Sequence, residues 1–126
     1  MIDLNEVLDF HNELIDKHGG ANGIRDKNLL LSALARPYMT FNQQELYSTP
    51  SLKAAAIFES IVINHPFMDG NKRTAFLLLR LILQDYDYDI SAGEDDKYEM
   101  TISASMGNLR FEGIVSWIEE RLIINK

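Results

Sequence analysis

The chain has 126 residues, 46% hydrophobic and 25% charged, a composition that excludes global disorder and fits one domain over residues 1–126. Twelve Lys and Arg against nineteen Asp and Glu give a formal net charge of −7, which argues against nucleic acid binding but allows a local basic cluster that holds one phosphorylated ligand. The absence of cysteine excludes disulfides, thiolate nucleophiles and cysteine-based metal sites.

The first half of the chain contains two segments of helical period. Apolar residues at three- and four-residue steps predict an amphipathic helix that begins near Leu4 and ends at Gly19-Gly20. Asp26 is placed to cap a short second helix, which Pro37 stops. Residues 38–50 show no period and are interpreted as a loop.

The rest of the chain is also read as helical. Four further helices are predicted, over about 51–64, 71–86, 94–105 and 112–124. Ser51 is expected to cap the first of them, and the turn region 85–89 can hold a short extended piece. Because no segment alternates with period two for long enough to form a sheet, the predicted fold class is all-α, a compact bundle of about six helices.

The helices over 51–64 and 71–86 are apolar around most of their circumference. A helix of this kind is buried on most sides, so these two are expected to form the centre of the bundle. Glu59 and Arg80 interrupt them and are expected to pair with each other or with outer helices.

No segment has the features of a membrane span or a signal peptide. The most apolar runs are about ten residues long, whereas a span needs roughly twenty. The N-terminus is acidic and amphipathic and lacks the basic start of a signal peptide. We therefore expect a soluble, cytoplasmic protein.

A dense set of polar groups lies between the two apolar helices. His65, Asp69, Asn71, Lys72 and Arg73 bring an imidazole, a carboxylate, an amide, an ammonium and a guanidinium together within nine residues. Because charges beside a core are costly without partners or a function, this segment is interpreted as a built site.

Several of these residues suit the binding of phosphate. Gly70, Asn71 and Lys72 fall at the predicted start of a helix, where free N–H groups form an anion cradle. Arg73 offers a fork of donors that matches phosphate oxygens, and Lys72 adds a mobile positive charge. The segment therefore predicts a site for a phosphorylated ligand.

Two further residues suit catalysis. Asp69 is a hard oxygen ligand of the kind that Mg²⁺ prefers, although Asp69 and Asn71 could also simply cap the helix that follows. His65 can take a proton from a hydroxyl nucleophile at neutral pH. Phe67 is expected to pin the loop into the core, and His11, on the apolar stripe of the first helix, is interpreted as a core histidine rather than a site residue.

Residues 65–73, His-Pro-Phe-Met-Asp-Gly-Asn-Lys-Arg, resemble the signature of Fic-domain proteins, His-x-Phe-x-(Asp/Glu)-x-Asn-(Gly/Lys)-Arg. The resemblance is closest to the Doc branch, the death-on-curing toxins of toxin–antitoxin systems. The stretch from Gly19-Gly20 to Pro37 and the overall length are also similar to Doc proteins, so the resemblance covers essentially the whole chain.

The resemblance implies a role for each site residue. They are a general base (His65), a Mg²⁺ ligand (Asp69), an anion hole (Gly70, Asn71 and Lys72) and a phosphate-binding residue (Arg73). It also implies that residues 38–50 form a flap that lines the target polypeptide.

Two positions differ from the adenylylating Fic enzymes and are shared with the Doc branch. Lys72 stands where those enzymes have glycine, and Phe76 stands where they have a second arginine. The resemblance therefore implies an ATP-dependent kinase that phosphorylates a threonine of elongation factor Tu and stops translation. AMP transfer to a protein hydroxyl and a non-catalytic module that binds a nucleotide or a partner are the alternatives.

Control by another polypeptide is expected. Self-silencing Fic enzymes carry a Ser/Thr-x-x-x-Glu-Gly/Asn motif, and its nearest approach here, from Ser116 to Glu120, is followed by Arg121. The resemblance implies a Phd-like antitoxin, whose helix would occupy a groove near the site.

Overall fold

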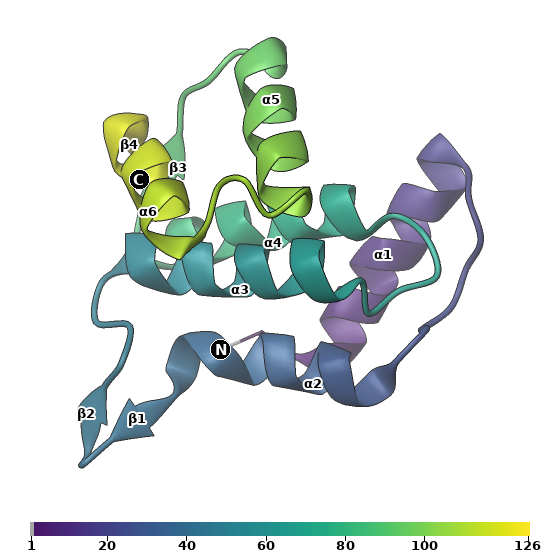
Figure 1. Ribbon diagram of the computed structural model, residues 1–126, viewed down its shortest axis with the longest axis horizontal. Coiled ribbons are helices and arrows are strands. Elements are labelled where there is room, and N and C mark those ends of the chain that lie inside the picture. The colour runs from purple at the N-terminus through teal and green to yellow at the C-terminus, as the bar shows by residue number, and fades with distance from the viewer. Residues whose placement is uncertain (1) are drawn as a thin grey trace.

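A computed structural model describes residues 2–126 (Figure 1), so Met1, with which the predicted domain begins, lies outside it. Over these residues the chain forms six α-helices: α1 (Leu4–His18), α2 (Lys27–Ala35), α3 (Pro50–Asn64), α4 (Asn71–Asp85), α5 (Glu94–Ser105) and α6 (Phe111–Glu120). Four short strands form two antiparallel pairs: β1 (Thr40–Phe41) with β2 (Gln44–Glu45), and β3 (Tyr88–Ile90) with β4 (Leu122–Ile124). The predicted all-α bundle is confirmed, with two short strand pairs of which the sequence indicated only an extended piece near β3.

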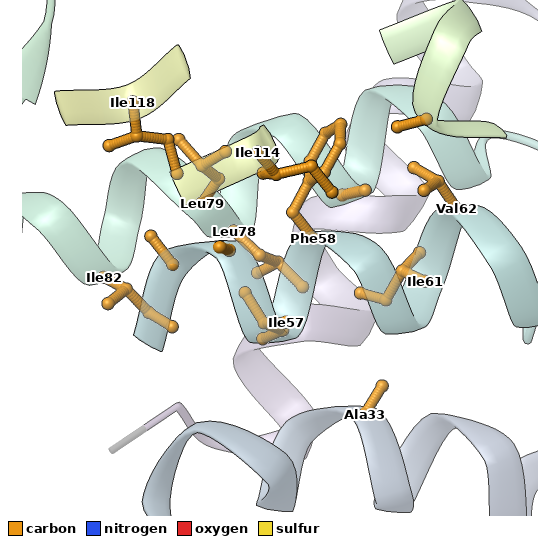
Figure 2. Packing of buried hydrophobic residues seen from close by; sticks show 14 of the residues in the cluster. Ala33, Ile57, Phe58, Ile61, Val62, Leu78, Leu79, Ile82, Ile114 and Ile118 are labelled. Atoms are coloured by element: carbon orange, nitrogen blue, oxygen red, sulfur yellow. The ribbon is translucent and has the colours of Figure 1, made fainter. Parts of the chain in front are cut away.

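Helix α3 forms the centre of the molecule, as its composition predicts. Every residue from Lys53 to Val62 is buried, and α3 packs against α2, α4, α5 and α6. Figure 2 shows apolar side chains of α3 meeting those of α4 and α6, among them Ile57, Phe58, Ile61, Leu78, Leu79, Ile114 and Ile118. Burial of such side chains contributes about 1.5–3 kcal/mol each, so this contact is the main stabilising one.

Helix α4 is buried on one side only, which corrects the prediction that it is enclosed like α3. Leu78, Leu79 and Ile82 are fully buried, whereas Phe76 and Leu77 are half-buried. The reason is that these two residues line an open groove between α4 and α5, described below.

The helix ends follow local signals with one correction. Gly19 ends α1 with a positive φ of 85°, which glycine adopts without strain, and the Asp26 carboxylate caps α2 by accepting from the Leu29 N–H at 3.0 Å. The cap of α3 is Thr49, which accepts from the Leu52 N–H, and not the predicted Ser51. Pro50 takes the first helical position because no N–H is needed there, which moves the cap one residue upstream of the proline.

The last predicted helix is too long. Helix α6 ends at Glu120, and β4 (Leu122–Ile124) pairs with β3 in the register Tyr88 opposite Ile124. These residues continue the apolar pattern of the helix, but they are branched side chains that also suit a strand. The extended piece allowed at 85–89 is realised at the end of that region as β3, which extends one residue past it.

Residues 38–50 are more ordered than the predicted loop. A 3-10 turn (Arg36–Tyr38) follows α2, and β1 and β2 then form a hairpin. The buried side chain of Lys53 donates to the Glu45 carboxylate at 2.8 Å and to the Tyr47 carbonyl. The hairpin is therefore tied to the first turns of α3.

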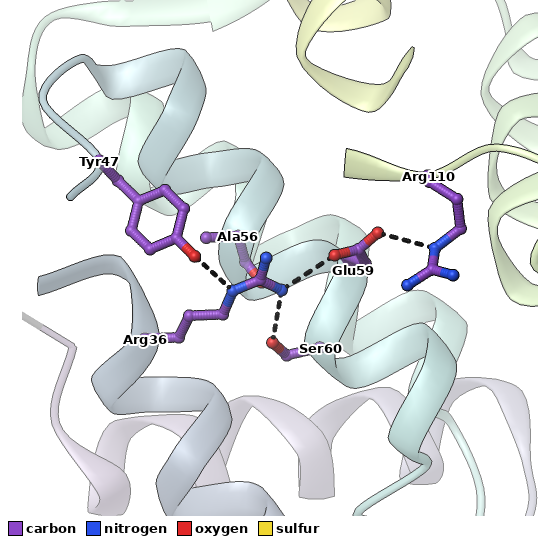
Figure 3. A network of polar contacts seen from close by, with 6 residues as sticks. All are labelled: Arg36, Tyr47, Ala56, Glu59, Ser60 and Arg110. Carbon is purple, nitrogen blue, oxygen red and sulfur yellow. Dashed lines mark hydrogen bonds and ion pairs between the residues drawn. The ribbon is translucent and has the colours of Figure 1, made fainter. Parts of the chain in front are cut away.

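Glu59 and Arg80 do not pair with each other. Glu59 lies between Arg36, which precedes the hairpin, and Arg110, which precedes α6, at 3.0 and 3.2 Å (Figure 3). Arg80 donates to both carboxylate oxygens of Asp89 in β3 and lowers the pKa of Asp89 to about 2, from an ordinary 3.8. Both central charges thus bind groups on outer elements, the second alternative that the sequence left open.

Within residues 2–126 we find no helix with the length and apolar character required to cross a bilayer.

Candidate active site

The polar segment forms a loop that joins α3 to α4. His65 ends α3 in a left-handed conformation, with φ of 49° and ψ of 62°, and its N–H donates to the Ile61 carbonyl at 3.0 Å. Pro66 follows and cannot continue the helix. Phe67 is 1% exposed, which confirms that it pins the loop into the core. The imidazole of His65 is left on the exposed side of the loop.

The segment between α1 and α2 lies against this loop as a short strap, which we define as residues 19–26. The N–H groups of Arg25 and Asp26 both donate to the Pro66 carbonyl, at 2.7 and 3.0 Å. Met68 N–H donates to the Gly23 carbonyl at 3.0 Å, and Ile24 and Phe67 form a β-bridge. The strap therefore fixes the loop through backbone contacts.

The position of the β1–β2 hairpin contradicts the expectation that residues 38–50 form a flap beside the site. The β1–β2 hairpin precedes α3 and lies at the end of that helix opposite the α3–α4 loop (Figure 1). A helix of this length spans about 22 Å, so the hairpin is far from His65. The strap, rather than the hairpin, is the segment that borders the predicted site.

The side chain of Arg25 reaches from the strap to the end of α3. Its Nε donates to the His65 carbonyl and its Nη2 to the Asn64 carbonyl, each at 2.6 Å. A cation at a helix C-terminus is favoured by the helix dipole, and these bonds satisfy carbonyls that the helix leaves without partners. This role could not be predicted from the sequence, because both acceptors are backbone groups.

Asp69 is held from two directions. One carboxylate oxygen, Oδ2, accepts from the Ala21 N–H at 2.7 Å, and the backbone carbonyl of Asp69 accepts from His11 Nε2 at 2.7 Å. His11 is 1% exposed, as expected for a core histidine. These contacts fix both the side chain and the backbone of Asp69, and neither was foreseen.

The start of α4 has no side-chain cap, so the capping alternative for Asp69 and Asn71 is wrong. Gly70 takes the capping position with φ of 76°. The Asn71 amide instead exchanges two hydrogen bonds with the backbone of Phe67, at 2.9 and 3.0 Å. Because no side chain within residues 2–126 accepts from the first turn, its N–H groups remain available to an anion.

One open cavity of about 670 Å³ collects all the predicted site residues, a volume in the range of ligand pockets. They are His65, Asp69, Gly70, Asn71, Lys72 and Arg73. Arg25 also lines it. Lys72 and Arg73 are exposed and form no ion pair with any described carboxylate, so their charge is free to meet a ligand.

A second hollow adjoins this cavity, which we call the α4–α5 groove. It measures about 560 Å³, and apolar side chains such as Leu14, Phe76 and Ile102 line it. Four cationic side chains also line it: Lys72, Arg73, Arg80 and Lys97. Because Lys72 and Arg73 line both hollows, a molecule in the groove would touch the cavity.

The donors of the cavity fit Mg²⁺ held together with a phosphorylated ligand. Asp69 offers one carboxylate, of which Oδ1 accepts no hydrogen bond from the described residues. Residues 2–126 contain no cluster of three or more acidic, histidine or cysteine side chains that could hold a metal alone. Mg²⁺ commonly binds through one or two carboxylates and completes its shell with phosphates and water.

Comparison with known proteins agrees with the motif. The sequence model of the Fic/DOC family matches residues 1–83, which include α1, the strap, α3 and the loop. The protein "Toxin Doc" of Mycolicibacterium smegmatis is 39% identical over 83 residues. That match covers 61% of this chain and 64% of the relative, so the two correspond over less than two thirds of either length.

Proposed function

This chain belongs to the Fic/DOC family, and we propose that it is a Doc-type toxin that transfers a phosphoryl group from ATP to a hydroxyl side chain of a target protein. The observation that supports this most is the composition of one cavity. It joins an imidazole, a carboxylate, and a helix start and two cations that have no side-chain cap and no ion pair within residues 2–126. The relative from M. smegmatis is itself named a toxin.

Phosphoryl transfer depends on alignment and on neutralisation of charge. In the proposal the first-turn N–H groups of α4, with Lys72 and Arg73, bind the phosphate oxygens of ATP. Donors of this kind are worth about 3–4 kcal/mol each in the transition state. Together, the first-turn N–H groups, Lys72 and Arg73 orient the terminal phosphate toward the exposed side of the loop.

His65 serves as the general base. It accepts the proton of the target hydroxyl while the hydroxyl oxygen bonds to the γ-phosphorus and the bond to the β–γ bridging oxygen breaks, which releases ADP. Asp69 holds Mg²⁺, which when bound supplies positive charge to the phosphates. The Ala21 N–H keeps the Asp69 carboxylate oriented for that role.

Transfer of the γ-phosphate is favoured over AMP transfer by two residues. Lys72 is a long cation where adenylylating members have glycine, and it takes space that a triphosphate bound in their orientation would need. Phe76 lines the α4–α5 groove where those members have a second arginine. The proposed target is a threonine of elongation factor Tu in the cytoplasm, so that transfer stops translation.

The proposed partner is a Phd-like antitoxin. The α4–α5 groove has apolar walls and four cations, of which Arg80 and Lys97 already pair with Asp89 and Glu94. The apolar walls with Lys72 and Arg73 suit an acidic amphipathic helix. Such a helix would contact Lys72 and Arg73 and so withhold them from ATP. This arrangement accounts for silencing without an inhibitory motif in the chain.

The test uses purified protein, elongation factor Tu, Mg²⁺ and ATP labelled on either the γ- or the α-phosphate. We expect label in the factor only from the γ position. Label only from the α position would establish AMP transfer instead.

A growth assay separates catalysis from binding. Wild type expressed alone is expected to arrest a bacterium, whereas His65→Ala, Asp69→Ala and Arg73→Ala are not. Equal toxicity of all four proteins would favour the non-catalytic binding module.

A further inference from the structure

His11 connects α1 to the site through two contacts with the α3–α4 loop. Its ring stacks on Phe67, with centroids 3.9 Å apart and planes inclined by 9°. Its Nε2 lies 2.7 Å from the carbonyl oxygen of Asp69, 58 residues along the chain. A carbonyl oxygen only accepts, so Nε2 carries the proton of this bond.

The bond to Asp69 also determines where the next N–H points. A peptide unit is planar and trans, so its C=O and N–H point in opposite directions. With the Asp69 carbonyl held toward α1, the N–H of Gly70 points away from α1. Gly70 lines the cavity, and its N–H has no acceptor among residues 2–126.

Gly70 needs such an external constraint. Its φ of 76° is a conformation that glycine adopts freely, so glycine by itself does not select one orientation of the preceding peptide. A Cβ at Gly70 would lie 3.1 Å from Ile15 Cδ1 and 3.5 Å from His11 Nε2, so a larger residue would crowd Ile15 and would also be strained at this positive φ. The selection is left to the neighbours on α1.

We propose that His11 is a positioning residue of the site: its Nε2–H···O=C bond to Asp69 orients the 69–70 peptide so that the Gly70 N–H faces the bound phosphate. This inference rests on the proposed function for the identity of the ligand. The orientation of the peptide itself is a property of the free protein and is tested without ATP.

The test compares two variants that separate the donor from the ring. His11→Phe keeps an aromatic ring for the stack on Phe67 but has no donor, whereas His11→Gln places an N–H the same number of bonds from Cα and loses the ring. We expect His11→Phe to weaken ATP affinity about tenfold, as for one lost hydrogen bond, and His11→Gln to stay within about threefold of wild type. Equal affinity of His11→Phe and wild type, or equal loss in both variants, would overturn the proposal.

Two spectroscopic measurements on the free protein keep the test independent of ATP binding. At neutral pH the ¹⁵N spectrum of wild type should show His11 protonated at Nε2, and the Gly70 amide resonance should move in His11→Phe and return toward its wild-type position in His11→Gln. A proton on Nδ1 alone in wild type contradicts the proposal even if His11→Phe fails to fold. An unmoved Gly70 resonance in folded His11→Phe contradicts it as well. If wild type binds no ATP while these signals are as expected, the proposed function fails and the positioning role stands.

Discussion

The guanidinium of Arg25 donates to the backbone carbonyl of His65 at 2.6 Å, so a side chain of the strap holds the backbone of the proposed general base. Arg25 also donates to Asn64, and it thereby spans two successive carbonyls. The left-handed conformation of His65 is uncommon for a residue with a side chain, and such a conformation persists where neighbours enforce it.

We expect Arg25→Ala to lower kcat about tenfold with a smaller change in the KM for ATP, because the base is displaced while the phosphate ligands stay in place. The kcat of Arg25→Lys should lie between those of Arg25→Ala and wild type, since an ammonium lacks the fork that spans two carbonyls. Lys27→Ala, which removes an exposed cation two residues away, is the control and should be unchanged. A kcat in Arg25→Ala equal to that of wild type would show that the contact is not needed.

Arg73 is expected to be the most sensitive phosphate ligand. Arg73→Ala should reduce the transfer rate by about 10²–10³-fold, because a preorganised donor for developing charge is lost from the cavity. Arg73→Lys keeps the charge without the fork and should recover part of the loss. Single-turnover transfer assays measure both, and a loss below about threefold in Arg73→Ala would contradict the role.

The transfer rate should depend on His65 as the proton acceptor. His65→Ala should lower the transfer rate by about 10²–10⁴-fold, because no group then accepts the proton of the target hydroxyl. Single-turnover transfer assays measure the loss. A rate in His65→Ala within about threefold of wild type would count against His65 as the base.

The Arg80–Asp89 pair should make the free energy of unfolding depend on pH below about 4. Because Arg80 lowers the pKa of Asp89 from 3.8 to about 2, the pair stabilises the folded state fully above about pH 4, and this stabilisation is lost as the pH falls toward 2. Arg80 is 39% exposed, which weakens the pair, so Arg80→Gln should cost about 1–2 kcal/mol at pH 7. In urea unfolding the difference between wild type and variant should shrink at pH 2, and a constant difference would contradict the assignment.

If the antitoxin binds in the α4–α5 groove, a substitution there should prevent neutralisation by the antitoxin without removing toxicity. Tyr98 lines the groove and is 68% exposed, so Tyr98→Glu would place an acid against the proposed acidic helix. We expect the variant to stay toxic but to escape rescue by its antitoxin, measured as growth on co-expression. Met106→Glu, at a residue of equal exposure outside the groove, should be rescued like wild type.

The sequence predicted most helices because their signals are local. The three- and four-residue spacing of α1, the Asp26 cap and the apolar composition of α3 each depend on neighbours along the chain. The end of α6 does not: Leu122–Ile124 continues the apolar pattern, and only pairing with β3, more than thirty residues earlier, makes it a strand. Such long-range pairing leaves no local trace.

The site divides in the same way. The six predicted residues fall within nine positions, 65–73, in the α3–α4 loop and the first turn of α4. A motif could therefore reveal them together, and the structure places them around one cavity. Arg25 and Ala21 escaped notice, and His11 was interpreted as a core residue only. All three come from other elements and act on backbone groups or through them. The one usable sign was His11 itself, since a buried imidazole needs a hydrogen-bond partner.

The two ion pairs of Glu59 bear on how far the chain can be truncated. The family match ends at residue 83, yet this carboxylate on α3 accepts from Arg110, well beyond that point, as well as from Arg36 within it. A fragment that ends at residue 83 would also lack Ile114 and Ile118, which pack against α3 and α4, and would expose an apolar surface to water. The segment that the family model matches therefore lacks part of the core on which its own helices depend. Truncated proteins that end at residue 83 should aggregate.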